Sequence, residues 1–189
     1  HYVVSNFNKK SLKNISVLEI GCAYGTSGMI ITNALNNFNF NQNISYTAID
    51  PNQQLEWNDI GVYNINQITK DSFMEKKFIY NYSTYTMKVL AEQKKKYNLI
   101  FIDGSHEYSV VLNDSKFADK LLKINGIVVH DDVLHDGVSK AIKEYYSKNK
   151  NYRRIQINEE TLKIDKISSL SKKTSWHNPS TMYAYQKIK

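Results

Sequence analysis

Residues 15–28, Ile-Ser-Val-Leu-Glu-Ile-Gly-Cys-Ala-Tyr-Gly-Thr-Ser-Gly, decide the predicted fold. The apolar and β-favouring residues 15–20 predict a buried strand, and residues 29–35 predict a helix. The turn between them contains Gly21 and Gly25, and glycines at such positions indicate that the backbone comes close to another group. The sequence therefore predicts a first strand that runs through a tight turn into a helix.

The composition is that of one folded domain. The chain has 189 residues, enough for a full hydrophobic core, and no apolar run approaches the ~20 residues of a membrane span. Its single cysteine, Cys22, excludes an internal disulfide and favours a reducing, cytoplasmic compartment. We expect one domain over residues 1–189, with a polar lead-in at 1–14. Because the first residue is His1, we also expect a longer polypeptide, in which an upstream targeting segment or other transferase domains could be present.

The net charge of +7 is weak support for a nucleic-acid partner. Only Arg153 and Arg154 among the 25 basic residues are arginines, whereas bidentate recognition of phosphates and base edges favours arginine. We interpret most of the charge as solvated surface.

Strand and helix patterns alternate along the rest of the chain. Only a loop separates the last two predicted strands, so we expect them to pair antiparallel. The alternation predicts an α/β fold with a seven-stranded, mostly parallel, doubly wound sheet, whose ligand crevice lies beyond the carboxyl ends of the strands. Residues 53–75 have a helical tendency that Gly61 interrupts. The further predicted strands are 44–50, 77–82, 97–103, 127–130, 152–157 and 181–188, and the further predicted helices are 84–96, 108–123 and 137–150.

Acidic residues follow three of these strands. Asp50 ends the second strand, where a carboxylate can accept hydrogen bonds from both ribose hydroxyls of a nucleotide; the alternative is a helix cap. Asp103 ends the fourth strand, and Asp131 and Asp132 end the fifth, so the three should meet at one rim. Three close carboxylates repel one another unless they share a cation, and all-oxygen ligation suits Mg²⁺ or Mn²⁺. Capping and loop roles are the alternative.

The pattern Glu19-x-Gly21-x-x-x-Gly25 resembles motif I of the class I S-adenosylmethionine-dependent methyltransferases. This resemblance implies a Rossmann-like fold in which the glycine turn, with Tyr24, approaches the methionine part of the cofactor. It also implies that Glu19 shapes the turn and receives polar contacts. Ser83 matches a position whose side chain reaches the adenine ring. The alternatives are an ordinary strand–turn–helix with structural glycines and a plain helix N-cap at Ser83.

The sequence Asp103-Gly104-Ser105-His106 is similar to that of the metal-dependent sugar O-methyltransferases, which methylate rhamnose-like or macrolide sugars. The resemblance extends over residues 17–132. It implies that Asp103, Asp131 and Asp132 bind the metal, that Asp103 also lies at the cofactor, and that His106 is the general base. Some of these enzymes have Glu where Asp131 stands, which is a departure from their pattern.

These observations predict a methyl transfer from S-adenosylmethionine to a hydroxyl of a small-molecule or glycan acceptor. A cation lowers the pKa of a bound hydroxyl, and an imidazole of ordinary pKa ~6.5 can accept its proton. Three alternatives remain: a catechol-type phenol acceptor, an RNA methyltransferase, and a non-catalytic cofactor-binding domain. His135 is the next histidine to test, whereas His130, Asp136 and His177 are expected outside the reacting centre. The rings that could face a sugar are those of Trp57, Tyr85, Tyr108 and Trp176.

Overall fold

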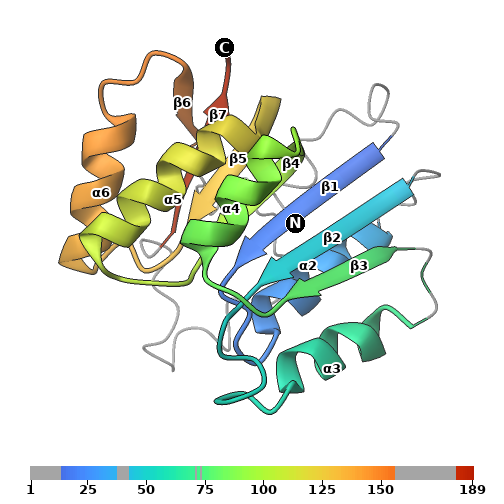
Figure 1. Ribbon diagram of the computed structural model, residues 1–189. Helices are drawn as coiled ribbons and strands as arrows, with labels where there is room; N and C mark the ends of the chain where they lie inside the picture. The colour runs from blue at the N-terminus through green and yellow to red at the C-terminus, as the bar shows by residue number, and fades with distance from the viewer. Residues whose placement is uncertain (1–13, 38–42, 71, 73, 156–181) are drawn as a thin grey trace, which may run out of the picture.

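The computed structural model describes residues 14–37, 43–70, 72, 74–155 and 182–189 (Figure 1). Its described strands form a seven-stranded sheet of order β3-β2-β1-β4-β5-β7-β6. The strands are β1 (Asn14–Ile20), β2 (Asn43–Ile49), β3 (Glu75–Ile79), β4 (Tyr97–Ile102), β5 (Leu122–His130), β6 (Tyr152–Ile155) and β7 (Tyr183–Lys187). The helices are α2 (Thr26–Asn37), α3 (Ile60–Ile68), α4 (Ser83–Glu92), α5 (Tyr108–Leu121) and α6 (Asp136–Tyr146).

Strand directions confirm the predicted fold class. β1 to β5 pair in parallel, whereas β7 is antiparallel to both β5 and β6. β4 lies between β1 and β5, and all six of its residues are buried, as expected for a central strand covered on both faces. The chain therefore has the Rossmann-like arrangement that places a crevice beside β1.

Two hydrophobic clusters hold the helices against the sheet. Alternate residues of each strand face opposite sides, so Leu18 packs with α4, α5 and α6, while Val17 packs with α2 and α3. Figure 1 shows α4, α5 and α6 together on one face of the sheet and α2 on the other. None of the helices in the described ranges is long and apolar enough to cross a membrane.

Several predicted boundaries were wrong. Gly61 does not interrupt a helix but lies in the first turn of α3, and the third strand covers 75–79 rather than 77–82. α4 ends at Glu92 instead of residue 96, because Lys94 takes a left-handed φ of 56°. β5 begins at Leu122 rather than at residue 127. The expectations for 1–13, 156–157, Trp176, His177 and 181 fall outside the described residues.

Candidate active site

A cavity of about 510 Å³ opens at the carboxyl ends of β1, β2 and β4. Its wall also includes the starts of α4 and α5, so the cavity occupies the crevice predicted from the topology. Its lining contains the acids Asp50, Asp103 and Glu107 but no Lys or Arg among the described residues. The other residues of the lining are Ile20, Gly21, Ala23, Ile49, Pro51, Asn52, Trp57, Tyr82, Ser83, Thr84, Gly104, Ser105 and Val110.

The two predicted turn glycines allow close packing of backbones. Gly21 has a φ of 82°, and a Cβ there would lie 2.0 Å from the Asp103 carbonyl oxygen. Gly25 has a φ of 78°, and its Cβ would lie 2.7 Å from the Gly61 carbonyl oxygen. Gly21 lines the cavity, whereas Gly25 is absent from its described lining. Gly25 therefore acts here by letting the turn pack on α3.

Asp50 fixes the shape of the glycine turn. Its Oδ2 accepts hydrogen bonds from the N–H groups of Cys22 (3.0 Å) and Ala23 (2.8 Å) and from Nε2 of Gln53 (3.0 Å). Its Oδ1 accepts a hydrogen bond from the N–H of Asn52 (2.8 Å). Asp50 is 6% exposed and lines the cavity, so it supports the turn while facing the crevice.

Glu19 lies beneath the same turn. It is fully buried, accepts hydrogen bonds from the hydroxyls of Ser27 and Tyr46, and is absent from the described lining of the cavity. Burial raises the pKa of the Glu19 carboxyl to about 7, although both hydrogen bonds lower it. Glu19 thus joins β1, α2 and β2 beneath the turn, and its turn-shaping role stays a prediction.

Ser83 is the first residue of α4, not its N-cap. Its Oγ lies 3.0 Å from Oδ2 of Asp114, a residue of α5 that is 1% exposed. Burial raises the pKa of Asp114 to about 7, and its Oδ1 has no partner among the described residues. Asp114 was not predicted from the sequence, although an acid on the apolar face of a helix is a signal that a polar partner lies opposite.

The three predicted metal-binding acids lie at neighbouring strand ends. Ile102 and His130 are register partners in β4 and β5, so Asp103 and Asp131 follow at the same edge. Burial and then the charges of Asp131 and Asp132 raise the pKa of Asp103 to about 7. The carboxyl oxygens of the three acids do not all lie within 4.8 Å of one another. Their oxygens and mutual repulsion fit a hard divalent cation, and this site stays a prediction.

His106, the predicted base, forms a pair with Asp132. Its Nε2 lies 2.8 Å from Oδ2 of Asp132, and the two side chains are 46% and 40% exposed. The His135 ring stacks on that of His106, with centroids 4.2 Å apart and planes at 16°. One nitrogen or oxygen atom from each of His106, Asp132 and His135 lies within 4.8 Å of the other two. Imidazole lone pairs lie in the ring plane, so two stacked rings cannot both point at one ion; the arrangement favours a hydrogen-bonded pair covered by a second ring.

The remaining predicted residues have varied surroundings. Tyr24 is 54% exposed, is absent from the described lining, and packs edge-on against Trp57 at 4.8 Å. Tyr85 is 67% exposed, and the Tyr108 hydroxyl donates a hydrogen bond to Glu144. His130 is fully buried, and burial lowers its pKa to about 3, in line with its expected place outside the reacting centre.

Comparisons with known proteins agree with this fold. The sequence model of a family described as "Methyltransferase domain" matches residues 18–133. CalS11, described as a TDP-rhamnose 3'-O-methyltransferase of calicheamicin biosynthesis, has a TM-score of 0.61 and 13% identity over 95% of this chain and 73% of its own. An O-methyltransferase from Bacillus cereus, solved with SAH, has a TM-score of 0.59 and 14% identity over 91% and 74%.

Other solved structures with the same fold carry different descriptions. A putative rRNA methylase from Clostridium thermocellum has a TM-score of 0.62 and 12% identity over 98% of this chain and 94% of its own. A search of curated protein sequences found no match. At these identities the structural likeness shows the fold alone.

Proposed function

Because the chain belongs to the family of methyltransferase domains whose sequence model spans residues 18–133, we propose that it transfers a methyl group from S-adenosylmethionine to a hydroxyl of a sugar or glycan. The S–CH₃ bond of the sulfonium breaks as the O–CH₃ bond forms, and S-adenosylhomocysteine leaves. The observation that carries the proposal is the His106–Asp132 pair. The pair is absent from the described lining of the cavity, but Asp132 is close enough for its charge to act on Asp103, which lines it. The description of CalS11 as a sugar O-methyltransferase supports the choice of acceptor.

The pair suits His106 to accept the proton of the acceptor. An ionised carboxylate only accepts hydrogen bonds, so Nε2 of His106 carries the proton that points to Asp132. The lone pair then lies on Nδ1, which is the atom that takes the hydroxyl proton. Stacking by His135 limits the rotation of the ring. Removal of this proton is needed because a sugar hydroxyl is a poor nucleophile at neutral pH.

The cavity has the chemistry expected of a site for this cofactor. Gly21 lets the turn come close to the methionine part, Asp50 would receive the ribose hydroxyls, and Ser83 would face the adenine. The acids and the absence of Lys and Arg in the described lining favour a cationic sulfonium. Glu19 and Gly25 would act indirectly, by holding the turn.

Asp103, Asp131 and Asp132 would hold a Mg²⁺ or Mn²⁺ ion, whose positive charge would offset their repulsion. Such a cation, when bound, fixes an acceptor oxygen and lowers the pKa of its hydroxyl. This part of the proposal rests on the donor set and its electrostatics.

A methyl-transfer assay on a panel of sugars and phenols, with and without EDTA, tests the proposal. We expect methylated sugar in the presence of Mg²⁺ or Mn²⁺ and loss of turnover with EDTA. Methylation confined to phenols would contradict the sugar acceptor and favour a catechol-type enzyme. Activity unchanged by EDTA would contradict the cation site alone. SAH binding with no transfer to any acceptor would indicate a non-catalytic domain.

A further inference from the structure

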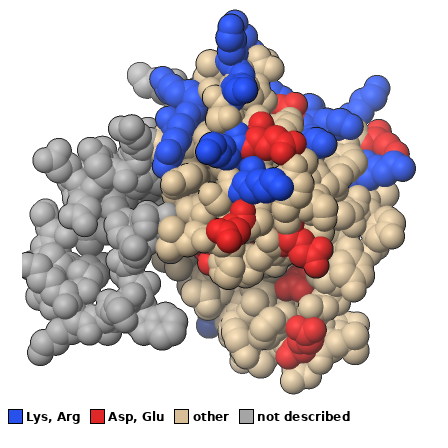
Figure 2. All heavy atoms as spheres, turned by 90° about the vertical axis from the view of Figure 1, so that its left-hand side faces the viewer, with Lys and Arg blue, Asp and Glu red and all other residues tan. Residues whose placement is uncertain are grey.

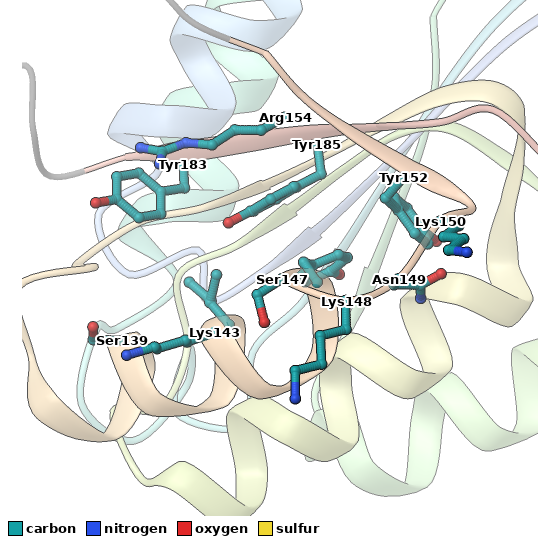
Figure 3. Close-up of a pocket in the computed structure, with 12 residues that line it drawn as sticks. Ser139, Lys143, Ser147, Lys148, Asn149, Lys150, Tyr152, Arg154, Tyr183 and Tyr185 are labelled. Atoms are coloured by element: carbon teal, nitrogen blue, oxygen red, sulfur yellow. The ribbon is translucent and has the colours of Figure 1, made fainter.

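A second cavity, of about 800 Å³, lies between α6 and the antiparallel strands β6 and β7 (Figure 3). We call it the basic groove and define it by Ser139, Lys143, Lys148, Arg154, Tyr183 and Tyr185, which line it together with neighbours on the same elements. It shares no lining residue with the cavity at the ends of β1, β2 and β4. The basic groove is therefore a separate cavity, and none of its residues has a role in the proposed methyl transfer.

The two cavities carry opposite charge. The lining of the basic groove includes Lys143, Lys148, Lys150 and Arg154, and no Asp or Glu among the described residues. Figure 2 shows Lys and Arg side chains gathered over one part of the face on this side of the molecule, with Asp and Glu mostly below them. The other cavity has three acids and no described cation in its lining. An anionic ligand is favoured in the basic groove, and a cationic sulfonium is favoured in the other cavity.

The guanidinium of Arg154 stacks on an aromatic ring. It lies over the ring of Tyr183, 3.7 Å from the centroid, and Figure 3 shows the two side chains together at one edge of the groove. Tyr185 stacks on Tyr146 with centroids 4.3 Å apart. A guanidinium stacked on a ring keeps its N–H edge free, and that planar edge matches the geometry of phosphate oxygens.

One end of the basic groove lies at the sheet edge that carries Asp131. Tyr183 is the register partner of His130, the residue before Asp131. At the start of α6, the N–H of Ser139 donates a hydrogen bond to the His135 carbonyl oxygen (2.9 Å). From Ser139 the groove follows α6 to Ser147, a distance of roughly 12 Å at the ordinary helical rise. The groove thus runs from the segment that carries Asp131 and His135 along the outer part of α6.

We propose that the basic groove binds a phosphate or diphosphate joined to the sugar that is methylated, with Arg154 and Lys143 contacting its oxygens. The acceptor is then an anionic, phosphate-linked sugar rather than a neutral one. This inference rests on the proposed function for the identity of the acceptor. The binding of the phosphate group can be measured without it.

Titration calorimetry on the whole chain tests the phosphate site directly. The probes are inorganic pyrophosphate, a simple sugar phosphate and a nucleoside diphosphate, each with SAH present. We expect the double variant Arg154→Gln/Lys143→Gln to bind at least one probe about tenfold more weakly or worse than the unchanged chain. The probe that binds best distinguishes a sugar phosphate from a nucleotide-linked sugar.

Arg153→Gln is the matched control. Arg153 neighbours Arg154 on β6 but points to the other face, where it donates a hydrogen bond to Gln186 (2.7 Å), and it does not line the groove. We expect this variant to keep its affinity for the probes, and both variants to keep their affinity for SAH and their melting temperature. Equal losses in the two variants, or no binding of any probe, would overturn the proposal.

Kinetics separate this inference from the proposed function. With a phosphate-linked sugar, the double variant should raise KM about tenfold and change kcat little. Methylation of a neutral sugar as efficiently as of its phosphate-linked form would overturn the groove inference and leave the proposed function intact. Phosphate binding that depends on Arg154 and Lys143, without methyl transfer to any acceptor, would overturn the proposed function and leave the phosphate site intact. If a short RNA binds more tightly than every probe, with a steep dependence on salt, the proposal is overturned and the acceptor is a nucleic acid.

Discussion

Ser83 Oγ donates a hydrogen bond of 3.0 Å to Oδ2 of Asp114, and only Ser83 of this pair lines the cavity. An ionised Asp114 only accepts hydrogen bonds, so the Ser83 hydroxyl points its proton at Asp114 and keeps its lone pairs free to face the cavity. Those lone pairs can accept a hydrogen bond from the 6-amino group of an adenine. We therefore expect Asp114 to act as a positioning residue, by orienting the Ser83 hydroxyl toward the proposed cofactor.

Asp114→Asn should weaken SAH binding about fivefold at pH 8, because an amide can donate to Ser83 and turn its hydroxyl proton toward the cavity. Calorimetry with SAH and with its 6-oxo analogue would measure this change. Ser83→Ala should remove the preference for SAH over its 6-oxo analogue. Adding Asp114→Asn to this variant should then cause no further loss of SAH affinity. Additive losses would show that Asp114 does not act through Ser83.

Protonation of Asp114 should have a similar effect. Because burial raises the pKa of this carboxyl to about 7, the unchanged chain should prefer the 6-amino form at pH 8 and lose part of that preference at pH 6. In Asp114→Asn the preference should not change between these two pH values. An unchanged preference in both proteins would contradict the role of the carboxylate.

The position of this site, but not its detail, could be predicted from the sequence. The alternation of apolar strands with amphipathic helices predicts a mostly parallel sheet, and parallel strands bring Asp50 and Asp103 to the same edge. Asp114 was missed because the apolar pattern of α5 predicts which face is buried and not which element supplies a polar partner. The stack of His135 on His106 depends on loop conformations after β4 and β5, which periodicity does not encode.

His106→Ala should lower kcat by about 10² to 10⁴-fold, the usual contribution of a general base, and leave the affinity for SAH unchanged. Asp132→Asn should also lower kcat, because the amide can present its NH₂ group to Nε2 and because the neutral side chain is a weaker ligand for the proposed cation. The measurement is methyl transfer at saturating cofactor, alongside calorimetry with SAH. Unchanged turnover in His106→Ala would remove this residue from the mechanism.

Gly61→Ala should disturb the cofactor turn from outside the cavity. The new Cβ would lie 2.3 Å from the Ala23 carbonyl oxygen and 3.1 Å from the Gly25 nitrogen, so α3 must move away. We expect a loss of about 1–3 kcal/mol in the free energy of unfolding, as for other overpacked sites, and weaker SAH binding. Gln67→Ala, at an exposed position of α3, is the control. Equal denaturation midpoints of the two variants would contradict this packing.

The buried Glu19 should make stability depend on pH. Its folded pKa of about 7 lies above the ordinary value of 4.5, so between these pH values the folded chain binds more protons than the unfolded one. Stability from this group is therefore present below pH 4.5 and is lost as the pH rises toward 7, by an amount on the order of 3 kcal/mol. Glu19→Gln carries no charge at either pH and keeps an acceptor for Ser27 or Tyr46. The melting temperature of Glu19→Gln relative to the unchanged chain should therefore be higher at pH 8 than at pH 5. Other titrating groups contribute equally to both proteins and cancel in this comparison. If the relative melting temperature is the same at pH 5 and pH 8, Glu19 is ionised across this range and its pKa is not raised.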